Sequence, residues 1–356
     1  MSTVTIVGAG LMGTAVAWPL ADNGHEVRLV GTHLDAEIIA SCLDRRYHPR
    51  LRRILPDSVQ PFYIEQLAEA LDGAEVIVSG VNSLGVHWIG RTLGPLLWPG
   101  ATIIAVTKGL EATSGGMIRI LPDVLREELP AGLQDKVTLA AIGGPCIAGE
   151  LAGRRPTCVV FTSHDEPALA RLRAVFSTGY YHIWLSTDVV GVEVCAALKN
   201  AYTVAVGLAL GALERDGGVD QAGAGMHNLA AALFGVSAAE MTRLVTLMGG
   251  RPEKVFGLPG VGDQYVTCVG GRTVRLGTLL GRGLTYSQAV TEMAGETLEG
   301  AYVVRQLAKA LPLWERQGII GLQELPLLRM LCRVITEDAP VEIPFDQFFG
   351  PSFRIP

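Results

Sequence analysis

The sequence predicts an α/β domain built on a parallel sheet, followed by an all-helical domain. Short apolar runs rich in β-branched residues alternate with helical stretches in the first half of the chain, a pattern typical of a parallel sheet covered on both faces. From Val189 onward the apolar patterns become long and helical. A length of 356 residues suits about two domains at roughly 150 residues each. We therefore expect domains at 1–188 and 189–356.

The strands of the first domain are read from its apolar runs. The first strand is expected at 4–8, and a helix at 14–22 and a second strand at 26–30 follow it. The remaining expected elements are strands at 75–79, 102–107, 138–142, 158–162 and 182–185, with a helix at 166–176 between the last two.

The composition describes a compact chain with a large apolar core. Hydrophobic residues make up 49% of it and charged residues 18%, and 29 Lys and Arg against 35 Asp and Glu leave a net charge of −6. This balance is unlike that of disordered or nucleic-acid-binding chains, so we expect no nucleic-acid partner. Glycine is in excess, at 43 residues, which indicates many tight turns or places where the backbone approaches a ligand.

The cysteine pattern and the longest apolar stretch bear on the compartment. The six cysteines are scattered without zinc-site or CxxC spacing, so we expect no metal site. Scattered single cysteines fit a reduced cytoplasm, where we expect the protein to be. The most apolar stretch, 201–213, is shorter than the roughly 20 residues that span a bilayer, so we expect no membrane insertion.

A nucleotide-binding motif follows the first strand directly. Gly8, Gly10 and Gly13 form a GxGxxG pattern that opens a helix within a strand–helix–strand unit of about 30 residues. The first glycine permits the turn, the second lets backbone approach a pyrophosphate, and the third lets helix and strand pack closely. The helix start, at Leu11 and Met12, would offer N–H groups to the phosphates. We expect a Rossmann-like dinucleotide-binding domain; the alternative is a glycine-rich turn without a ligand.

The residues after the second strand bear on the choice between NAD and NADP. An acidic residue there would bind the ribose 2′-hydroxyl of NAD, but this chain has Thr32 and His33, and Asp35 comes slightly late. Small polar residues leave room for a 2′-phosphate, which Arg45 and Arg46 are near enough in sequence to reach. The sequence therefore favours NADP slightly over NAD, although these arginines would also suit a solvated helix face.

A lysine interrupts the most apolar helix of the second domain. Lys199 and Asn200 lie inside VEVCAALKNAYTVAVGLAL, and charged groups are rarely buried without a partner. A lysine among apolar residues loses its proton more easily than a solvated lysine, which suits proton transfer near neutral pH. The alternative is a lysine on the exposed edge of the helix.

Other candidate residues lie where strands or turns end. Ligands of a parallel sheet bind beyond the carboxyl ends of its strands, which is where Lys108 and the segment from Gly144 to Cys146 are expected. Asp263 closes the turn GLPGVGD and would either aim a carboxylate inward or cap a helix. The turn 270–273 is a candidate anion site because its glycines expose N–H groups and Arg272 offers bidentate binding, although a surface arginine is an equal alternative.

Taken together, these segments resemble the NAD(P)-dependent glycerol-3-phosphate dehydrogenase family, and its archaeal-type members most closely. The matching segments run in order over about residues 3–305: VGAGLMGTAVA, TKGLE, GGPCIAGELAGRRPT, EVCAALKNAY, AAEMTRL, GGRPEKVFGLPGVGDQYVTC, GGRTVRLGTLLGRG and LEGAYV. The resemblance implies a helical second domain of the 6-phosphogluconate dehydrogenase-like type, a homodimer, and reduction of dihydroxyacetone phosphate at its C2 carbonyl by NAD(P)H.

The resemblance also implies roles for single residues. Lys199 matches the proton donor and acceptor at the C2 oxygen, Lys108 a ligand whose charge would make Lys199 easier to deprotonate, and Asp263 a carboxylate that orients the lysine or a substrate hydroxyl. The implied substrate-binding residues are Lys108, Gly144, Cys146, Lys199, Asn200, Asp263, Gly271, Arg272 and Thr273. The implied cofactor-binding residues are Gly8, Gly10, Leu11, Met12, Gly13, Thr32, His33, Lys108, Ala148, Arg272 and Glu299.

Four positions depart from the family pattern on or beside the substrate side. Thr273 stands where the family has Asn, Cys146 where it has Ser or Thr, Ala230 where it has Lys, and Gly149 where it has Lys. Losing one polar partner in a binding site typically costs about 1–3 kcal/mol, so these changes put the exact substrate in doubt more than the reaction.

The sequence leaves three alternatives to this function open. The first is the same chemistry on a different phosphorylated polyol or ketose phosphate. The second is an NADP(H)-binding protein that has lost catalysis, against which the retained Lys108, Lys199 and Asp263 argue. The third is a 2-ketoacid or ketopantoate reductase, a family that shares the two-domain layout but lacks the ALKN…GVGD…TC series.

Overall fold

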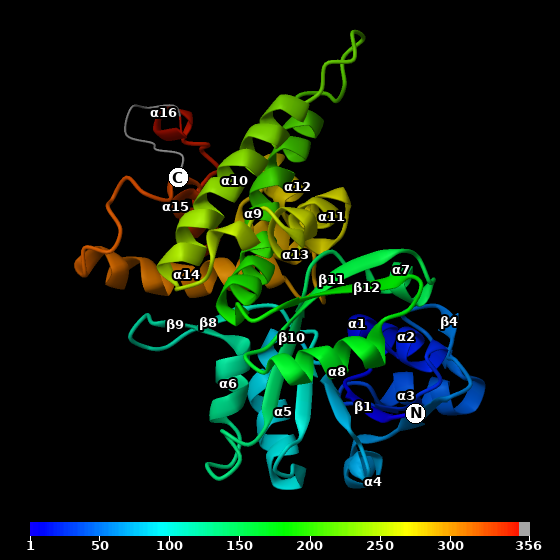
Figure 1. Cartoon of the computed structure of the whole chain (residues 1–356). Helices are drawn as coiled ribbons and strands as arrows, with labels where there is room; N and C mark the ends of the chain where they lie inside the picture. The colour runs from blue at the N-terminus through cyan, green and yellow to red at the C-terminus, as the bar shows by residue number, and fades with distance from the viewer. Residues whose placement is uncertain (349–356) are drawn as a thin grey trace. The chain divides into compact units, whose positions relative to one another are not determined.

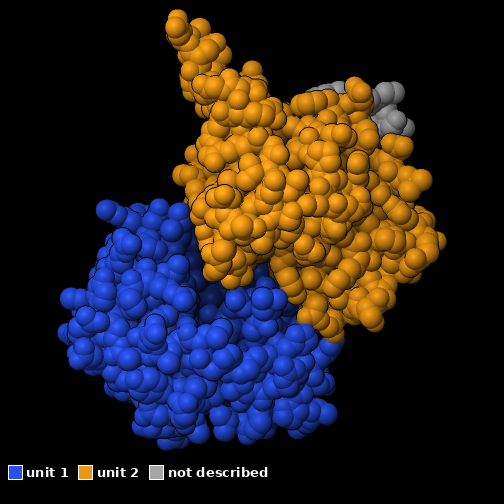
Figure 2. All heavy atoms as spheres, turned by 180° about the vertical axis from the view of Figure 1, so that it is seen from behind, with its two compact units in different colours: residues 1–108, 121–192 blue, residues 109–120, 193–356 orange. Residues whose placement is uncertain are grey.

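A computed structural model of the chain describes residues 1–348, and these fall into two compact units (Figure 2). Unit 1 consists of residues 1–108 and 121–192. Unit 2 consists of residues 109–120 and the chain from Glu193 onward. Each unit is described separately below.

Unit 1 is a sheet with helices on both faces, as the alternation of strands and helices predicts (Figure 1). In the described chain the sheet has eight strands, which are, in spatial order, β12 (Tyr181–Ser186), β11 (Thr157–Thr162), β10 (Thr138–Gly143), β7 (Thr102–Ala105), β6 (Val76–Ser79), β1 (Thr3–Val7), β2 (Glu26–Val30) and β5 (Val59–Phe62). Its helices are α1 (Leu11–Ala15), α2 (Ala17–Asp22), α3 (Ala36–Arg45), α4 (Leu67–Leu71), α5 (Val86–Leu93), α6 (Leu121–Glu127), α7 (Ala148–Ala152) and α8 (Glu166–Phe176).

The two faces of the sheet carry separate apolar cores. Side chains alternate along β1, so that Val4 and Ile6 join a core with α2, α3 and α8, whereas Val7 joins a core with α4, α5 and α6. This burial on both faces explains why the strands read as continuous apolar runs in the sequence.

The expectation of a fully parallel sheet is wrong at one junction. The pairs from β10 through β5 are parallel, but β11 runs antiparallel to β10. Only the short helix α7 lies between β10 and β11, and a chain returning to the same edge over so few residues pairs antiparallel more readily than through a crossover helix. The helix expected at 14–22 begins earlier, at Leu11, and is divided at Val16 into α1 and α2.

Several short elements had no clear signal in the sequence. The strand β5 at the sheet edge contains Pro61, and β3 (Tyr47–His48) and β4 (Arg53–Ile54) pair as a two-residue ribbon. A hairpin of β8 (Leu110–Ala112) and β9 (Ile118–Ile120) belongs to unit 2, where the N–H of Ala112 donates to Gln306 Oε1 at 3.0 Å. Unit 2 is therefore helical apart from this hairpin, within the described residues.

Unit 2 is built around one long buried helix, α9 (Val189–Arg215), of which every residue from 191 to 209 is buried. A helix that is apolar on nearly all sides needs neighbours all round. The other helices of this unit are α10 (His227–Leu247), α11 (Asp263–Val269), α12 (Arg272–Gly281), α13 (Tyr286–Glu292), α14 (Glu299–Arg316), α15 (Pro326–Glu337) and α16 (Phe345–Phe348).

One buried carboxylate joins three of these helices. Glu240 of α10 is 2% exposed and accepts hydrogen bonds from the hydroxyl of Tyr202 on α9 at 2.8 Å and from the N–H groups of Leu327 and Leu328 at 2.7 and 2.9 Å. The last two groups belong to the first turn of α15, where backbone N–H groups have no partner within the helix. Burial raises the pKa of Glu240 to about 7, and the three donors oppose this rise.

Two helices of unit 2 are long and apolar enough to cross a bilayer by length and composition alone. In α9 94% of the most apolar window is buried within the protein, and in α10 44% is. A helix in the core of a protein passes the same test when it is mostly buried, and α9 is mostly buried.

Candidate active site

The nucleotide loop, residues 8–13 of unit 1, packs through Gly8 and Gly13 against Gly80, which follows β6. Gly8 has a φ of +115°, and a Cβ added to it would lie 2.7 Å from the carbonyl carbon of Gly80. A Cβ on Gly13 would lie 2.4 Å from the Gly8 carbonyl oxygen. Gly10 differs, because its Cβ would meet only the Gly80 oxygen, at 3.7 Å. The space beside Gly10 therefore suits the close approach of a ligand, as the motif predicts.

The peptide groups of the loop are clamped at Ala9. The Ala9 N–H donates to Asp35 Oδ2 at 3.2 Å, and the Ala9 carbonyl accepts from His48 Nε2 at 2.9 Å. His48 is fully buried and its Nδ1 accepts from the Leu51 N–H at 3.0 Å, which assigns the proton to Nε2. Burial lowers the pKa of His48, so the ring is held neutral. Neither His48 nor Gly80 was predicted from the sequence. Gly80 follows an apolar strand directly, and this position at a strand end could have identified it.

The residues after β2 are arranged around the same carboxylate. Asp35 Oδ2 also accepts from the N–H and hydroxyl of Thr32, at 2.9 and 2.8 Å. The exposed ring of His33 meets Trp88 of α5 edge to face, with centroids 5.2 Å apart. Asp35 Oδ2 therefore already accepts hydrogen bonds from the Ala9 N–H and from the N–H and hydroxyl of Thr32. The Arg46 guanidinium donates to the carbonyls of Pro56 and Val59. It is therefore not directed towards Thr32, where the sequence suggested that it could reach a 2′-phosphate.

The carboxyl ends of β7 and β10 bring further predicted residues to the loop. Lys108 lies three residues beyond β7, because the strand ends at Ala105 and not at 107 as predicted, and its Nζ donates to the Gly144 carbonyl at 3.0 Å. Cys146 Sγ lies 3.8 Å from Met12 Sδ. Ala148, the first residue of α7, packs on the same apolar core as Met12 and Cys146. The predicted loop residues therefore lie together with Lys108, Gly144, Cys146 and Ala148 at the carboxyl ends of the strands of unit 1.

Unit 2 contains a buried cluster that we call the lysine site, composed of Lys199, Asp263 and Thr267. Lys199 Nζ lies 3.0 Å from Asp263 Oδ1 and donates to Thr267 Oγ1 at 2.8 Å. The Thr267 hydroxyl in turn donates to the Asp263 carbonyl at 2.7 Å, so its lone pairs face the lysine. The side chains of Lys199 and Asp263 are only 9% and 2% exposed.

The lysine site resolves two alternatives that the sequence left open. Lys199 is buried and does not lie on an exposed helix edge. Asp263 is the first residue of α11, so the N-cap position belongs to Gly262, and the Asp263 carboxylate is directed to Lys199. Thr267 lies four residues after Asp263, one helical turn away, and this spacing within GVGDQYVTC could have identified it.

Two buried amides follow residues of the lysine site directly in the sequence. Asn200, 3% exposed, has an Nδ2 without a hydrogen-bond partner among the described residues. Gln264 is fully buried, and neither polar atom of its amide has a partner in the described chain. A buried donor without a partner is costly, so the Asn200 amide is a candidate for a hydrogen bond to a ligand oxygen.

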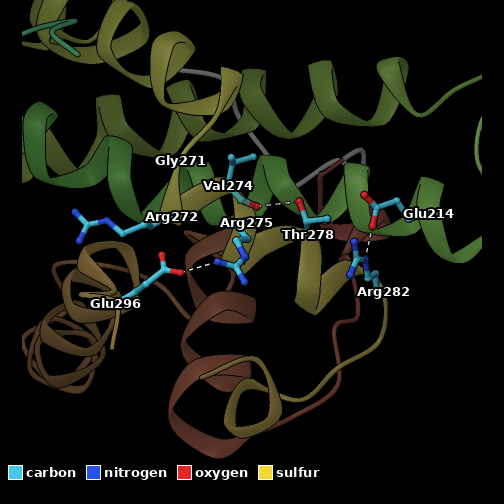
Figure 3. Close-up of a pocket in the computed structure, with 8 residues that line it drawn as sticks. All are labelled: Glu214, Gly271, Arg272, Val274, Arg275, Thr278, Arg282 and Glu296. Carbon is cyan, nitrogen blue, oxygen red and sulfur yellow. Dashed lines mark hydrogen bonds and ion pairs between the residues drawn. The ribbon is translucent and has the colours of Figure 1, made fainter. Parts of the chain in front are cut away.

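The predicted anion turn lines an open pocket of about 540 Å³ in unit 2 (Figure 3). Gly271, with a φ of +107°, precedes Arg272 at the start of α12. Arg275 pairs with Glu296 at 2.6 Å and Arg282 with Glu214, while Arg272 extends away from both pairs. Arg272 lies 4.0 Å from Glu299, the first residue of α14. Arg272 is about half exposed, as either alternative from the sequence would allow.

Comparisons with known proteins bear on what these groups do. Family models of the N-terminal and C-terminal parts of NAD-dependent glycerol-3-phosphate dehydrogenase match residues 3–169 and 188–345. The NADP(+)-dependent glycerol-3-phosphate dehydrogenase of Archaeoglobus fulgidus is 36% identical over 95% of this chain and 96% of its own. The chain belongs to the NAD(P)-dependent glycerol-3-phosphate dehydrogenase family. It is therefore an oxidoreductase that uses NAD or NADP, as the sequence predicts.

Other relatives agree with this assignment. The glycerol-3-phosphate dehydrogenase [NAD(P)+] of Halorhodospira halophila is 34% identical over 96% of this chain and 94% of its own. The crystal structure of glycerol-3-phosphate dehydrogenase from Coxiella burnetii matches with a TM-score of 0.79 and 28% identity, covering 97% of each chain. The predicted fold class, a Rossmann-like domain with a helical second domain, is confirmed.

Proposed function

We propose that the protein reduces the C2 carbonyl of dihydroxyacetone phosphate with NAD(P)H, and catalyses the reverse oxidation of glycerol 3-phosphate. The observation that carries this proposal is the lysine site: a buried Lys199 held by Asp263 and Thr267 in a chain that also has a dinucleotide-binding loop. A carbonyl reduction needs a proton donor beside the oxygen that receives charge, and an oriented ammonium group supplies one.

A dinucleotide held by the loop of unit 1 would supply, when bound, the hydride that the C2 carbon accepts. Lys199 Nζ gives a proton to the C2 oxygen as the negative charge develops on it, so the carbonyl becomes a secondary alcohol. Asp263 and Thr267 fix the direction of Nζ, and the Asp263 carboxylate stabilises the lysine as a cation before transfer. Lys108, at the sheet edge of unit 1, is the proposed second cationic ligand of the substrate.

The proposed phosphate site lies at the start of α12. Gly271 places backbone N–H groups there, Arg272 adds a guanidinium, and Thr273 adds a hydroxyl. We assign the Asn200 amide to a substrate oxygen, because its Nδ2 is buried and lacks a partner within residues 1–348. Gly144 and Cys146 of unit 1 are proposed as further substrate-binding residues.

The residues of the nucleotide loop fit a dinucleotide. Gly8 and Gly13 close the loop against Gly80, and Gly10 leaves space for the pyrophosphate, while Leu11 and Met12 begin the helix that faces it. Thr32 and His33 are proposed to border the adenosine ribose, with Ala148, Arg272 and Glu299 as further cofactor contacts.

We further propose that NADP is preferred. The carboxylate nearest to the end of β2, Asp35, accepts three hydrogen bonds from Ala9 and Thr32 and is 7% exposed. A carboxylate used in this way does not repel a 2′-phosphate as an exposed one would.

The organisation of the protein is proposed from the family and from the sequence. We propose a dinucleotide-binding domain at 1–188, a substrate domain at 189–356 and a homodimer formed through the helical domain. We propose a cytoplasmic location, with no nucleic-acid partner and no membrane insertion.

The test is oxidation of NADPH and NADH by the purified protein with dihydroxyacetone phosphate, run beside a panel of other ketose phosphates. The proposal predicts the highest kcat/KM for dihydroxyacetone phosphate with NADPH. A clear preference for a larger or unphosphorylated ketone would refute the substrate and favour the alternative raised by Thr273, Cys146, Ala230 and Gly149. Cofactor binding without turnover on any ketone would refute catalysis.

A further inference from the structure

Two helices of unit 2 pack through glycines at matched positions. Gly207 and Gly211 are four residues apart on α9, and Gly277 and Gly281 are four residues apart on α12, so each pair occupies one helix face. Glycine inside a helix costs about 1 kcal/mol relative to alanine, so four such positions call for a packing reason. Gly235 of α10 has no close packing neighbour, because a Cβ there would meet nothing within 4 Å.

The first pair of contacts is reciprocal. A Cβ on Gly207 would lie 2.5 Å from the Val274 carbonyl oxygen and 2.9 Å from the Cα of Gly277. A Cβ on Gly277 would lie 2.1 Å from the Val204 carbonyl oxygen. Both clashes are with backbone, which cannot rotate away as a side chain can.

The second pair, one turn further along, repeats the arrangement. A Cβ on Gly211 would lie 2.0 Å from the Thr278 carbonyl oxygen, and a Cβ on Gly281 would lie 2.2 Å from that of Leu208. Over two turns, α9 and α12 are therefore in direct backbone contact, and any side chain in this contact would separate them.

Each of these helices carries a group of the proposed site. Lys199 lies on α9, eight residues before Gly207, and Arg272 begins α12, five residues before Gly277. A third glycine contact adds α14: a Cβ on Gly300, which follows Glu299, would lie 2.6 Å from the Asn200 carbonyl oxygen and 2.9 Å from the Thr273 methyl group.

We propose that the α9–α12 glycine contact is a positioning device, which sets the separation between the proton donor Lys199 and the phosphate ligand Arg272. This inference rests on the proposed function. Since the C2 oxygen and the phosphate of one small substrate must reach both groups, the separation selects a phosphorylated ketone of the length of dihydroxyacetone phosphate. Gly207, Gly211, Gly277 and Gly281 act through the helices and touch no substrate.

The test compares two ketones in Gly277→Ala. With dihydroxyacetone phosphate, kcat/KM is expected to fall by about 10²-fold, a loss that a 1 Å misplacement of a binding group can cause. With unphosphorylated dihydroxyacetone at high concentration, which has no group for Arg272, kcat/KM is expected to change little. Gly235→Ala is the matched control in an open helical position and is expected to leave both values unchanged.

A double-mutant cycle with Arg272→Ala separates positioning from general destabilisation. If the glycine acts through Arg272, then Arg272→Ala/Gly277→Ala is expected to be no worse with dihydroxyacetone phosphate than Arg272→Ala alone. Equal losses on both ketones, additive losses in the cycle, or wild-type kinetics in a folded Gly277→Ala would each overturn the inference.

A second variant guards against failure to fold. A Cβ on Gly300 would meet one carbonyl oxygen at 2.6 Å and two methyl groups, Thr273 Cγ2 and Val204 Cγ2, at 2.9 Å, whereas a Cβ on Gly277 would lie 2.1 Å from a carbonyl oxygen. Gly300→Ala therefore disturbs the neighbouring contact of α14 with α9 and α12 less severely, and the same selective loss on the phosphorylated ketone is expected. The proposed function fails separately: in that case the wild-type protein would not reduce dihydroxyacetone phosphate at all.

Discussion

In unit 1 the nucleotide loop is held by hydrogen bonds to the backbone of Ala9, whereas in unit 2 the lysine site is held by a buried ion pair. The Asp35 carboxylate binds the N–H of Ala9 and a neutral His48 binds its carbonyl, so both polar backbone groups of this loop residue are fixed. Lys199 instead has its charge partner, Asp263, 3.0 Å away. A loop that binds an anion needs a fixed backbone, and a proton donor needs a fixed charge.

The largest effect is expected where the buried charge loses its partner. Asp263→Asn leaves Lys199 without its counter-charge and is expected to lower the free energy of unfolding by about 3–5 kcal/mol. The more exposed Arg243–Glu324 pair, also at 3.0 Å, is the control, and Glu324→Gln is expected to cost no more than about 1 kcal/mol. Urea unfolding of both variants measures this, and equal losses would contradict the comparison.

The backbone clamp of unit 1 is expected to matter for cofactor affinity. Asp35→Ala removes the acceptor for the N–H groups of Ala9 and Thr32 and is expected to weaken NADPH binding by about 1–3 kcal/mol. Asp35→Asn keeps one acceptor oxygen and is expected to lose less. Titration of NADPH fluorescence gives both affinities. Unchanged NADPH binding in Asp35→Ala would show that the hydrogen bonds to Asp35 do not contribute to cofactor affinity.

The two units are expected to respond to pH in opposite directions. Burial lowers the pKa of His48 below its ordinary 6.5, so the unfolded chain takes up this proton first and the stability that the neutral ring supplies is lost as pH falls through about 6.5. The pKa of Glu240 is raised from 4.5 to about 7, so its contribution is greatest below 4.5 and is lost as pH rises to about 7.

Urea midpoints measured between pH 4 and pH 8 test this contrast. Relative to the wild type, His48→Gln is expected to reduce the loss on the acid side, and Glu240→Gln the loss between pH 4.5 and 7. Identical pH profiles for the wild type and both variants would show that neither buried group controls stability.

The smallest effect is expected at Gln264, beside Asp263. Its buried amide makes no hydrogen bond within residues 1–348, so Gln264→Leu is expected to raise stability by about 1 kcal/mol, observed as a higher melting temperature. A lower melting temperature would show that the amide has a partner in solution, such as a buried water.

The sequence predicted best what local spacing controls. Lys199, Asn200 and Asp263 stood out because polar residues in apolar or glycine-rich surroundings are unusual, and the GxGxxG spacing fixed the loop. Lys108 and Gly144 were predicted from strand ends, and the structure joins them by a hydrogen bond.

What the sequence did not show depends on segments that are distant along the chain. The clamp on Ala9 requires His48, which lies 39 residues away in a stretch with no periodic pattern. The antiparallel β11 depends on how the chain returns after α7. The sequence gives no reason for Gly207 inside a predicted apolar helix or for Gly277, and the contact between their helices supplies that reason and accounts for part of the glycine excess.

The most direct test of the central claim is the rate of NADPH oxidation with dihydroxyacetone phosphate for the wild type and for Lys199→Ala, each shown to be folded and to bind NADPH. If Lys199 is the proton donor, the wild type turns over and kcat in Lys199→Ala falls by about 10²–10⁴-fold, while NADPH affinity is retained. Equal rates in the two proteins would contradict the account, because the reduction would then proceed without the buried lysine.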